Sequence, residues 1–204
     1  MVTRTRGRGA AHDQRRSEIV DAVLTVVADT GVPAVSIASV ATSAGVSPGR
    51  VQHYFATKAD LLEAAFDRVN AASSERIAAA VGGDLAAATP RQVLTVVLVE
   101  LVPHDEMSWA HMHIRQSFTA LALHHRSVAE RLRAQYEQLH HHDLADLIRR
   151  DQQAGLISTT VTPQAAGMGL AALVEGLAYY VLIGVASPEA AREQVLNAIS
   201  ELYR

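Results

Sequence analysis

Three side chains able to hydrogen bond to DNA bases lie close together near position 50 of this 204-residue chain. Arg50 can donate two hydrogen bonds to a guanine edge, Gln52 can pair with adenine, and His53 can reach a base or a phosphate. These residues predict a surface that reads DNA, provided that one helix presents them together.

A short helix that begins at Ser47 is expected to carry this surface. Ser47 is a favourable N-cap and Pro48 is favourable at the first helical position, so the sequence marks the helix start clearly. Val51, Tyr54 and Phe55 share one face, which leaves the polar residues on the other faces.

A second short helix precedes this one and ends in a tight turn. Ser36 can cap it, and its inward residues recur at helical spacing: Ile37, Val40, Ala41 and Ala44. Gly45 ends it, because glycine takes positive φ without the steric penalty of a Cβ atom. The two helices form a predicted helix-turn-helix, and Thr57 with Asp60 begins a further helix as a capping box.

The motif AxxAGVSxGxVxHYFxTKxxLL, which begins at Ala41, resembles the DNA-binding segment of TetR-type (TetR/AcrR) transcriptional regulators. The similar segment covers about residues 17–66, a quarter of the chain. That family often has an aromatic residue where this chain has Gln52, so the base preference does not transfer. The segment ALVEGLAYYVL in the C-terminal half is weakly similar to choline-responsive repressors of the same family.

The resemblance implies two sets of DNA contacts. The expected phosphate contacts, which position the protein without specifying sequence, are Ser36, Thr42, Ser47, Tyr54 and Lys58. The expected base-side residues are Pro48, Gly49, Arg50, Gln52 and His53. Capping alone would also explain the two serines, and packing of the ring in the core would also explain the tyrosine.

Composition and charge fit a DNA-binding globular protein. Hydrophobic residues make up 49% of the chain, enough for a sizeable core, and the absence of cysteine fits a reducing, cytoplasmic location. The start of the chain lacks the apolar segment of a secretory signal. Residues 1–60 hold seven Lys/Arg and five Asp/Glu, net +2, so the overall charge of −3 leaves −5 on the rest. The basic end is therefore expected to face DNA.

The first twelve residues are predicted to form a flexible basic arm that carries Arg4, Arg6 and Arg8. Such an arm can follow phosphates or enter the minor groove, although a solvated tail without contacts has the same composition. Residues 13–57 are expected to form the helix-turn-helix domain, and residues 58–204 a ligand-binding and dimerisation domain.

The whole chain is predicted to be all-α, with about nine helices and no strand segment. Outside the two short helices, the predicted ranges are residues 13–30, 58–81, 90–102, 105–124, 127–154, 163–185 and 188–204. The helix that follows the helix-turn-helix belongs to both domains, so it can carry a displacement from one to the other.

The last two helices are implied by the resemblance to form a four-helix dimer interface, through residues 164–183 and 189–202. Residues 165–186 are apolar enough to suggest a membrane span. Glu175 at their centre would be costly in a bilayer, and the many Gly and Ala residues favour close helix packing. A homodimer without a membrane anchor is expected.

An effector pocket is implied by the resemblance, among residues 91–184. The candidate wall residues are Trp109, His113, Phe118, Tyr136, Glu175 and Tyr179. Glu175 lies in an apolar helix and needs a partner, which can be Arg115, a histidine, a donor across the dimer or a cationic ligand. Trp109 can equally be a core residue.

No metal, cofactor or catalytic site is predicted. Residues 140–142 are consecutive histidines that point about 100° apart on a helix, so they cannot all ligate one ion. His111 and His113 lie on opposite sides of a helix, and one of them can line a pocket. The patterns of zinc proteases, serine hydrolases and nucleotide-binding loops are absent.

The sequence thus predicts a dimeric transcriptional regulator, a repressor that a small-molecule effector releases from a palindromic operator. A DNA-binding protein without a ligand and an enzyme that uses the C-terminal pocket are the alternatives.

Overall fold

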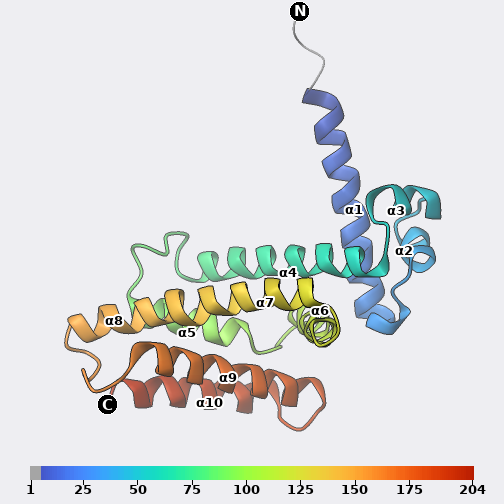
Figure 1. The fold of residues 1–204 in the computed structure, drawn as a ribbon. Coiled ribbons are helices and arrows are strands. Elements are labelled where there is room, and N and C mark those ends of the chain that lie inside the picture. The colour runs from blue at the N-terminus through green and yellow to red at the C-terminus, as the bar shows by residue number, and fades with distance from the viewer. Residues whose placement is uncertain (1–5) are drawn as a thin grey trace, which may run out of the picture.

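The computed structural model describes residues 6–204, with side chains for 10–139 and 142–204, and all the regular secondary structure in this part of the chain is helical (Figure 1). The N-terminal elements are α1 (Arg6–Thr30), the 3₁₀ turn η1 (Val32–Ala34), α2 (Ile37–Ser43), α3 (Pro48–Tyr54) and α4 (Lys58–Ala80). The C-terminal elements are α5 (Pro90–Glu100), α6 (Glu106–Ala122), α7 (Arg126–Glu137), the π-helical segment η2 (Gln138–Leu144), α8 (Ala145–Gln153), α9 (Pro163–Leu182) and α10 (Pro188–Leu202). The all-α prediction is confirmed.

Local capping sets the helix-turn-helix as the sequence predicts. The Ser36 side chain accepts a hydrogen bond from the backbone N–H of Ser39 at 3.0 Å and starts α2. Gly45 follows with φ of 63°, a left-handed conformation that disfavours residues with a Cβ atom. Ser47 then caps α3, accepting from the backbone N–H of Arg50 at 3.3 Å.

Two hydrophobic clusters form the core, and each contains helices from separate parts of the chain. The first joins α1–α4 to α6 and α7, and the rings of Phe66 on α4 and Phe118 on α6 stack with centroids 4.5 Å apart. The second joins α5, η2, α8, α9 and α10. Helices α4, α6 and α7 therefore share a core with the helix-turn-helix.

The arrangement in space follows from these clusters. Helices α1–α3 lie at one end of the molecule, and α4 runs from them along the body (Figure 1). Helices α9 and α10 pair along the side of the body away from α4 (Figure 1). The end of α1 that leads into α2 packs against α6, so α4 and α6 both connect the two ends.

The first helix begins earlier than predicted. It starts at Arg6, not near residue 13, so residues 6–12 are helical and are not the flexible arm that the sequence suggested. Arg6 and Arg8 lie within α1, whereas Arg4 lies outside the described residues. Glycines and the absence of an apolar stripe before Ile19 explain the error, since no local pattern marks this extension.

The helix predicted over residues 127–154 is present, but it is not α-helical throughout. It is α7, η2 and α8 in succession, with i to i+5 hydrogen bonding over Gln138–Leu144. The three consecutive histidines lie in this segment. A π-helical segment shifts the faces of the helix that follows, and the apolar periodicity of the sequence does not reveal it.

Candidate nucleic-acid interface and effector cavity

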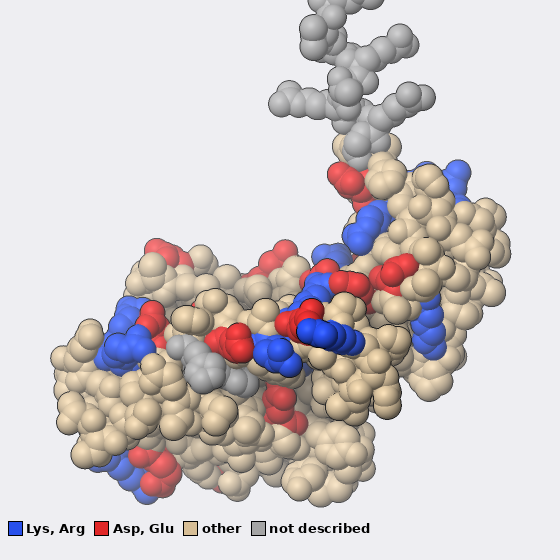
Figure 2. All heavy atoms as spheres, viewed as in Figure 1, with Lys and Arg blue, Asp and Glu red and all other residues tan. Residues whose placement is uncertain are grey.

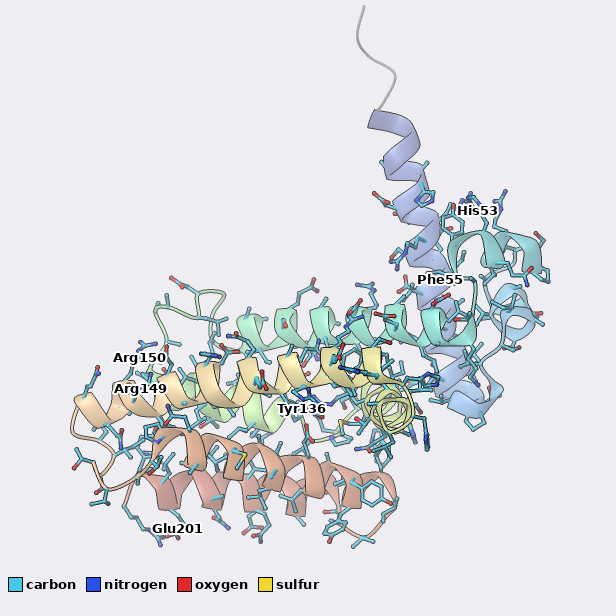
Figure 3. The ribbon with its side chains drawn as sticks, in the orientation of Figure 1. His53, Phe55, Tyr136, Arg149, Arg150 and Glu201 are labelled. Carbon is cyan, nitrogen blue, oxygen red and sulfur yellow. The ribbon has the colours of Figure 1, made fainter. Side chains whose placement is uncertain are left out.

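The five predicted base-side residues all lie exposed on α3. Val51 and Phe55 point inward and are buried, which leaves the opposite side of this short helix to solvent. Figure 3 shows His53 on the side of α3 that faces away from α4, and Phe55 lies nearer to α1. The exposed set is Pro48, Gly49, Arg50, Gln52 and His53.

The predicted phosphate contacts surround this face. Ser36, Thr42, Ser47 and Lys58 are exposed, and Tyr54 is half-buried. Lys58 already donates from Nζ to the carbonyl oxygens of Val32 and Pro33, at 3.1 and 3.2 Å. An ammonium group has three donors, so one N–H remains for a phosphate while two hold η1 against the start of α4.

Helix α1 supports α3 through aromatic contacts. The ring of Tyr54 lies 4.7 Å from that of His12 and 5.2 Å from that of His53, between ring centroids. The guanidinium of Arg16 lies over the Phe55 ring, 4.9 Å from its centroid. The half-burial of Tyr54 thus has a packing cause, and its hydroxyl group is not needed for that packing.

A cavity of about 340 Å³ lies between α4, α5, α6, α7 and η2. Its apolar lining is Phe66, Ile77, Val97, Leu101 and Leu139. Its polar lining is Asn70, Ser73, Ser74, His111, Arg115, Gln135, Tyr136, Gln138 and Asp143. The mixture of apolar walls and convergent polar groups is typical of small-molecule sites.

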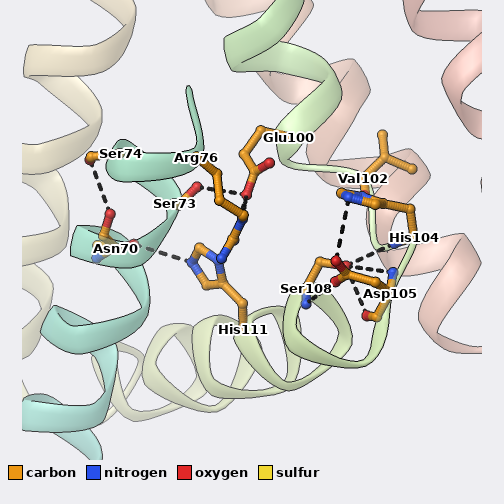
Figure 4. Close-up of polar contacts among 10 residues, drawn as sticks. All are labelled: Asn70, Ser73, Ser74, Arg76, Glu100, Val102, His104, Asp105, Ser108 and His111. Carbon is orange, nitrogen blue, oxygen red and sulfur yellow. Dashed lines mark hydrogen bonds and ion pairs between the residues drawn. The ribbon is translucent and has the colours of Figure 1, made fainter. Parts of the chain in front are cut away.

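Two buried polar residues, His111 and Ser73, line this cavity, and Figure 4 shows their polar contacts. His111 Nε2 lies 3.3 Å from Asn70 Oδ1, and burial lowers the pKa of His111 to about 3, with the nearby charges of Arg115 and Arg76 acting in the same direction. The imidazole is therefore neutral at physiological pH. Arg76 donates from Nε to Glu100 at 2.7 Å, and Ser73 donates to the same carboxylate at 3.2 Å.

Arg115 connects the cavity to the C-terminal helices. It forms an ion pair with Glu175 of α9 and donates to the hydroxyl of Tyr136 at 3.4 Å. Burial raises the pKa of Tyr136 above its ordinary value, although the charge of Arg115 acts in the opposite direction. Of the partners that the sequence left open for Glu175, the structure selects Arg115.

The structure places few of the predicted wall residues at the cavity. Tyr136 lines it, and Glu175 reaches it only through Arg115. Phe118 is 1% exposed within the first core cluster, and Tyr179 is exposed on α9. The remaining two predicted residues, Trp109 and His113, point elsewhere, because two positions along a helix turn a side chain by about 200° from the cavity face of α6.

Sequence reasoning missed most of the actual lining. His111, and not His113, is the histidine at the cavity. On α4, Asn70, Ser73, Ser74 and Ile77 follow the spacing i, i+3, i+4, i+7. That mostly polar stripe on a helix expected to belong to both domains was a signal of the site.

Two larger hollows are less suited to a ligand. One of about 550 Å³ lies between α1 and α6, and one of about 520 Å³ lies beside the loop that joins α4 to α5. Exposed side chains make up most of their walls, whereas the smaller cavity contains the buried His111 and Ser73. Among the residues with described side chains, no group of three His, Asp or Glu side chains could hold a metal ion.

Ion pairs tie the cavity helices to the DNA-binding end. Arg131 of α7 pairs with Glu63 and Asp67 of α4, and Arg68 of α4 donates to Asp21 of α1 at 3.1 Å. Figure 2 shows basic and acidic side chains alternating along this face. Helices α7, α4 and α1 are thereby linked in series.

Helix α9 has an exposed apolar face. Its exposed large side chains are Met168, Leu173, Tyr179 and Tyr180, and Ile183 and Val185 follow them. It is also the one helix in the described part of the chain that is long and apolar enough to cross a membrane, with a mean hydropathy of 1.5, and a third of its apolar stretch is buried. An exposed apolar face of this extent marks a surface that another molecule covers.

Comparison with known families identifies the class of protein. Residues 90–204, more than half of the chain, match the family described as BetI-type transcriptional repressor, C-terminal, and residues 19–65 match the bacterial regulatory proteins of the tetR family. The chain therefore belongs to the TetR family of transcriptional regulators, and its C-terminal half is of the BetI type. The predicted resemblance is confirmed.

Individual relatives agree. The regulator PksA of Bacillus subtilis is 28% identical over 172 residues, which cover 84% of this chain and 80% of that protein. The regulator BetI of Burkholderia mallei is 30% identical over 167 residues, which cover 80% of this chain and 79% of that protein. These relatives are transcriptional regulators and not enzymes, so the enzyme alternative is excluded.

Solved structures share the fold. A TetR-family regulator from Rhodococcus sp. superposes with a TM-score of 0.77 at 29% identity, covering 94% of this chain and all of that one. A regulator from Saccharomonospora viridis in complex with choline superposes with a TM-score of 0.80 at 20% identity. The superposition covers 92% of this chain and 96% of that one. At that identity the second likeness concerns the fold alone.

Proposed function

We propose that this protein is a homodimeric repressor that binds a palindromic operator and is released by a small-molecule effector bound in the cavity of α4–α7. One observation carries the proposal. The cavity is walled by α4 and α6, and these same helices share the core of the helix-turn-helix through the stacked rings of Phe66 and Phe118.

The DNA contacts follow from the exposed face of α3. Arg50 and Gln52 have the geometry for direct readout of guanine and adenine, with His53, Pro48 and Gly49 beside them. The predicted phosphate contacts, Ser36, Thr42, Ser47, Tyr54 and Lys58, would fix the register of α3 in the major groove. Their exposure around one face supports this division of roles.

Dimerisation is proposed through α9 and α10. The exposed apolar face of α9 supports it, and so do the small residues at Gly169 and Gly176, where nothing lies within 4 Å of an added Cβ atom. The ion pair between Glu175 and Arg115 anchors the middle of α9 to α6 of the same chain, which argues against a membrane span. The bacterial relatives support a cytoplasmic location.

Release of DNA is proposed to follow from a change in the cavity walls. An effector that binds preferentially to one arrangement of α4 and α6 would alter the distance between the two α3 helices of the dimer. An operator requires them about one DNA turn apart, roughly 34–36 Å. Coupling of about 1–3 kcal/mol, or about 5–150-fold in operator affinity, is typical of such systems.

Selection of operators from random duplex DNA at two salt concentrations tests the DNA-binding half of the proposal. A palindrome with half-sites about one turn apart is expected. Sedimentation should give a dimer, and the Tyr180→Glu variant should be a monomer with weak operator binding. The exposed Tyr179→Glu change is a second probe of the same face. Recovery of no preferred sequence, or a wild-type monomer, would contradict the proposal.

A further inference from the structure

We infer that the effector is an uncharged amphipathic molecule, one with a hydrocarbon part and a neutral hydrogen-bonding head group, and not a cation or an anion. This inference rests on the proposed role of the cavity between α4 and α7. It differs from what the choline-bound fold neighbour would suggest.

The cationic side chain that lines the cavity, Arg115, already has an anionic partner behind the wall. Arg115 pairs with Glu175. Behind the lining residue Ser73, Glu100 accepts a hydrogen bond from Ser73 and pairs with Arg76. A charged ligand would have to take one partner from such a pair and leave the other unpaired in a poorly hydrated place, which is costly. A neutral ligand leaves both pairs intact.

The other buried polar groups of the wall carry no charge. His111 is 4% exposed and neutral, since its pKa is lowered to about 3, and it contacts the amide of Asn70. Ser73 and the Tyr136 hydroxyl complete this set. Neutral donors and acceptors of this kind recognise hydroxyl, carbonyl or ester groups and give little compensation to an ion.

The aromatic rings do not offer a site for a cation. Phe66 has one face stacked on Phe118, with an interplanar angle of 18°. The guanidinium of Arg115 lies over the Tyr136 ring, 6.0 Å from its centroid. A quaternary ammonium group would need free ring faces, and here the positive charge of Arg115 already lies at one of them. Asp143, an exposed residue of the cavity lining, accepts a hydrogen bond on its carboxylate from Gln138 at 2.8 Å.

Three probes with the same hydrocarbon chain test the inference: octan-1-ol, octanoate and octyltrimethylammonium. Binding to the full-length dimer without DNA is measured by calorimetry at pH 7. The alcohol is expected to bind at least about tenfold more tightly than either ion, a difference that corresponds to about 1.4 kcal/mol. The inference would be overturned if either ion bound more tightly than the alcohol or if all three probes bound equally. It would also be overturned if the alcohol did not bind up to its solubility limit.

Two variants make the test directional. Glu175→Gln leaves Arg115 without its carboxylate and should shift the preference toward octanoate, by at least tenfold relative to wild type. Arg115→Gln leaves Glu175 unpaired and should shift it toward octyltrimethylammonium. The wild-type series stands even if one variant fails to fold. Unchanged preferences in two folded variants would refute the role given to this pair.

The same samples separate this inference from the proposed function. If the alcohol is preferred but operator affinity does not change on its addition, the chemistry of the cavity stands and the effector mechanism fails. If an ion binds more tightly and releases the operator, the mechanism stands and the inference fails.

Discussion

The DNA-reading end and the effector cavity use side chains in opposite ways. On α3 the residues proposed to act are exposed, and neighbouring residues in the sequence, such as Arg50, Gln52 and His53, lie together. In the cavity two polar side chains, His111 and Ser73, are buried, and polar groups are paired across the fold, as His111 is with Asn70 and Arg115 with Glu175. A surface that meets DNA can be built locally, whereas a site that encloses a small molecule needs several helices.

The largest expected effect comes from the contact that joins the two regions. Phe118→Ala removes a ring that is 1% exposed and stacked on Phe66, and should lower the free energy of unfolding by about 3–5 kcal/mol. Leu123→Ala, at a side chain that is 78% exposed, is the control and should change the free energy of unfolding by less than about 0.5 kcal/mol. Urea denaturation measures both. Similar values for the two variants would mean that the stacked rings do not join the regions.

Two substitutions test the separation of base reading from positioning at the DNA-binding end. Arg50→Ala should cost about 1–3 kcal/mol and relax preference at one operator position. Lys58→Ala should weaken binding to all sequences alike and reduce the salt slope by about one. Titration of operator and scrambled duplexes at several salt concentrations distinguishes them. Equal, sequence-independent losses would remove Arg50 from the base-side set.

The buried histidine predicts a pH dependence that belongs to the cavity. The pKa of His111 falls from 6.5 to about 3 on folding, so below pH 6.5 the unfolded chain takes up a proton that the folded chain does not. Its contribution to stability is complete above pH 6.5 and is lost as the pH falls toward 3. Between pH 7 and pH 5 the wild type should lose about 2 kcal/mol more than His111→Gln. Parallel losses in both proteins would show that His111 is charged in the folded state.

The smallest expected effects on stability come from alanine substitutions at a matched pair of glycines in the helix-turn-helix. Gly45→Ala should cost about 1–2 kcal/mol because its φ of 63° is left-handed. Gly49→Ala lies in α3 with nothing within 4 Å of the added Cβ atom, and should gain about 0.5–1 kcal/mol. Thermal unfolding without DNA compares them. Effects of the same sign would show that the turn does not depend on the glycine conformation.

The sequence by itself determined what depends on residues three or four positions apart. Ser36, Ser47 and Thr57 cap their helices where their side chains predict, and Gly45 turns the chain as predicted. The all-α class and the family also follow from sequence, since helical periodicity and the motif from Ala41 are both local. The assignment of individual residues to bases or phosphates stays a prediction.

Tertiary structure decided the cavity. Arg115 and Glu175 are 60 residues apart, and the rotation of α6 places His111 in the wall and turns His113 away. The π-helical segment and the early start of α1 likewise have no periodic signal. The physical reason is that a buried site depends on the angle at which each helix packs. Distant contacts set that angle, and a helical pattern in the sequence fixes only which residues share a face.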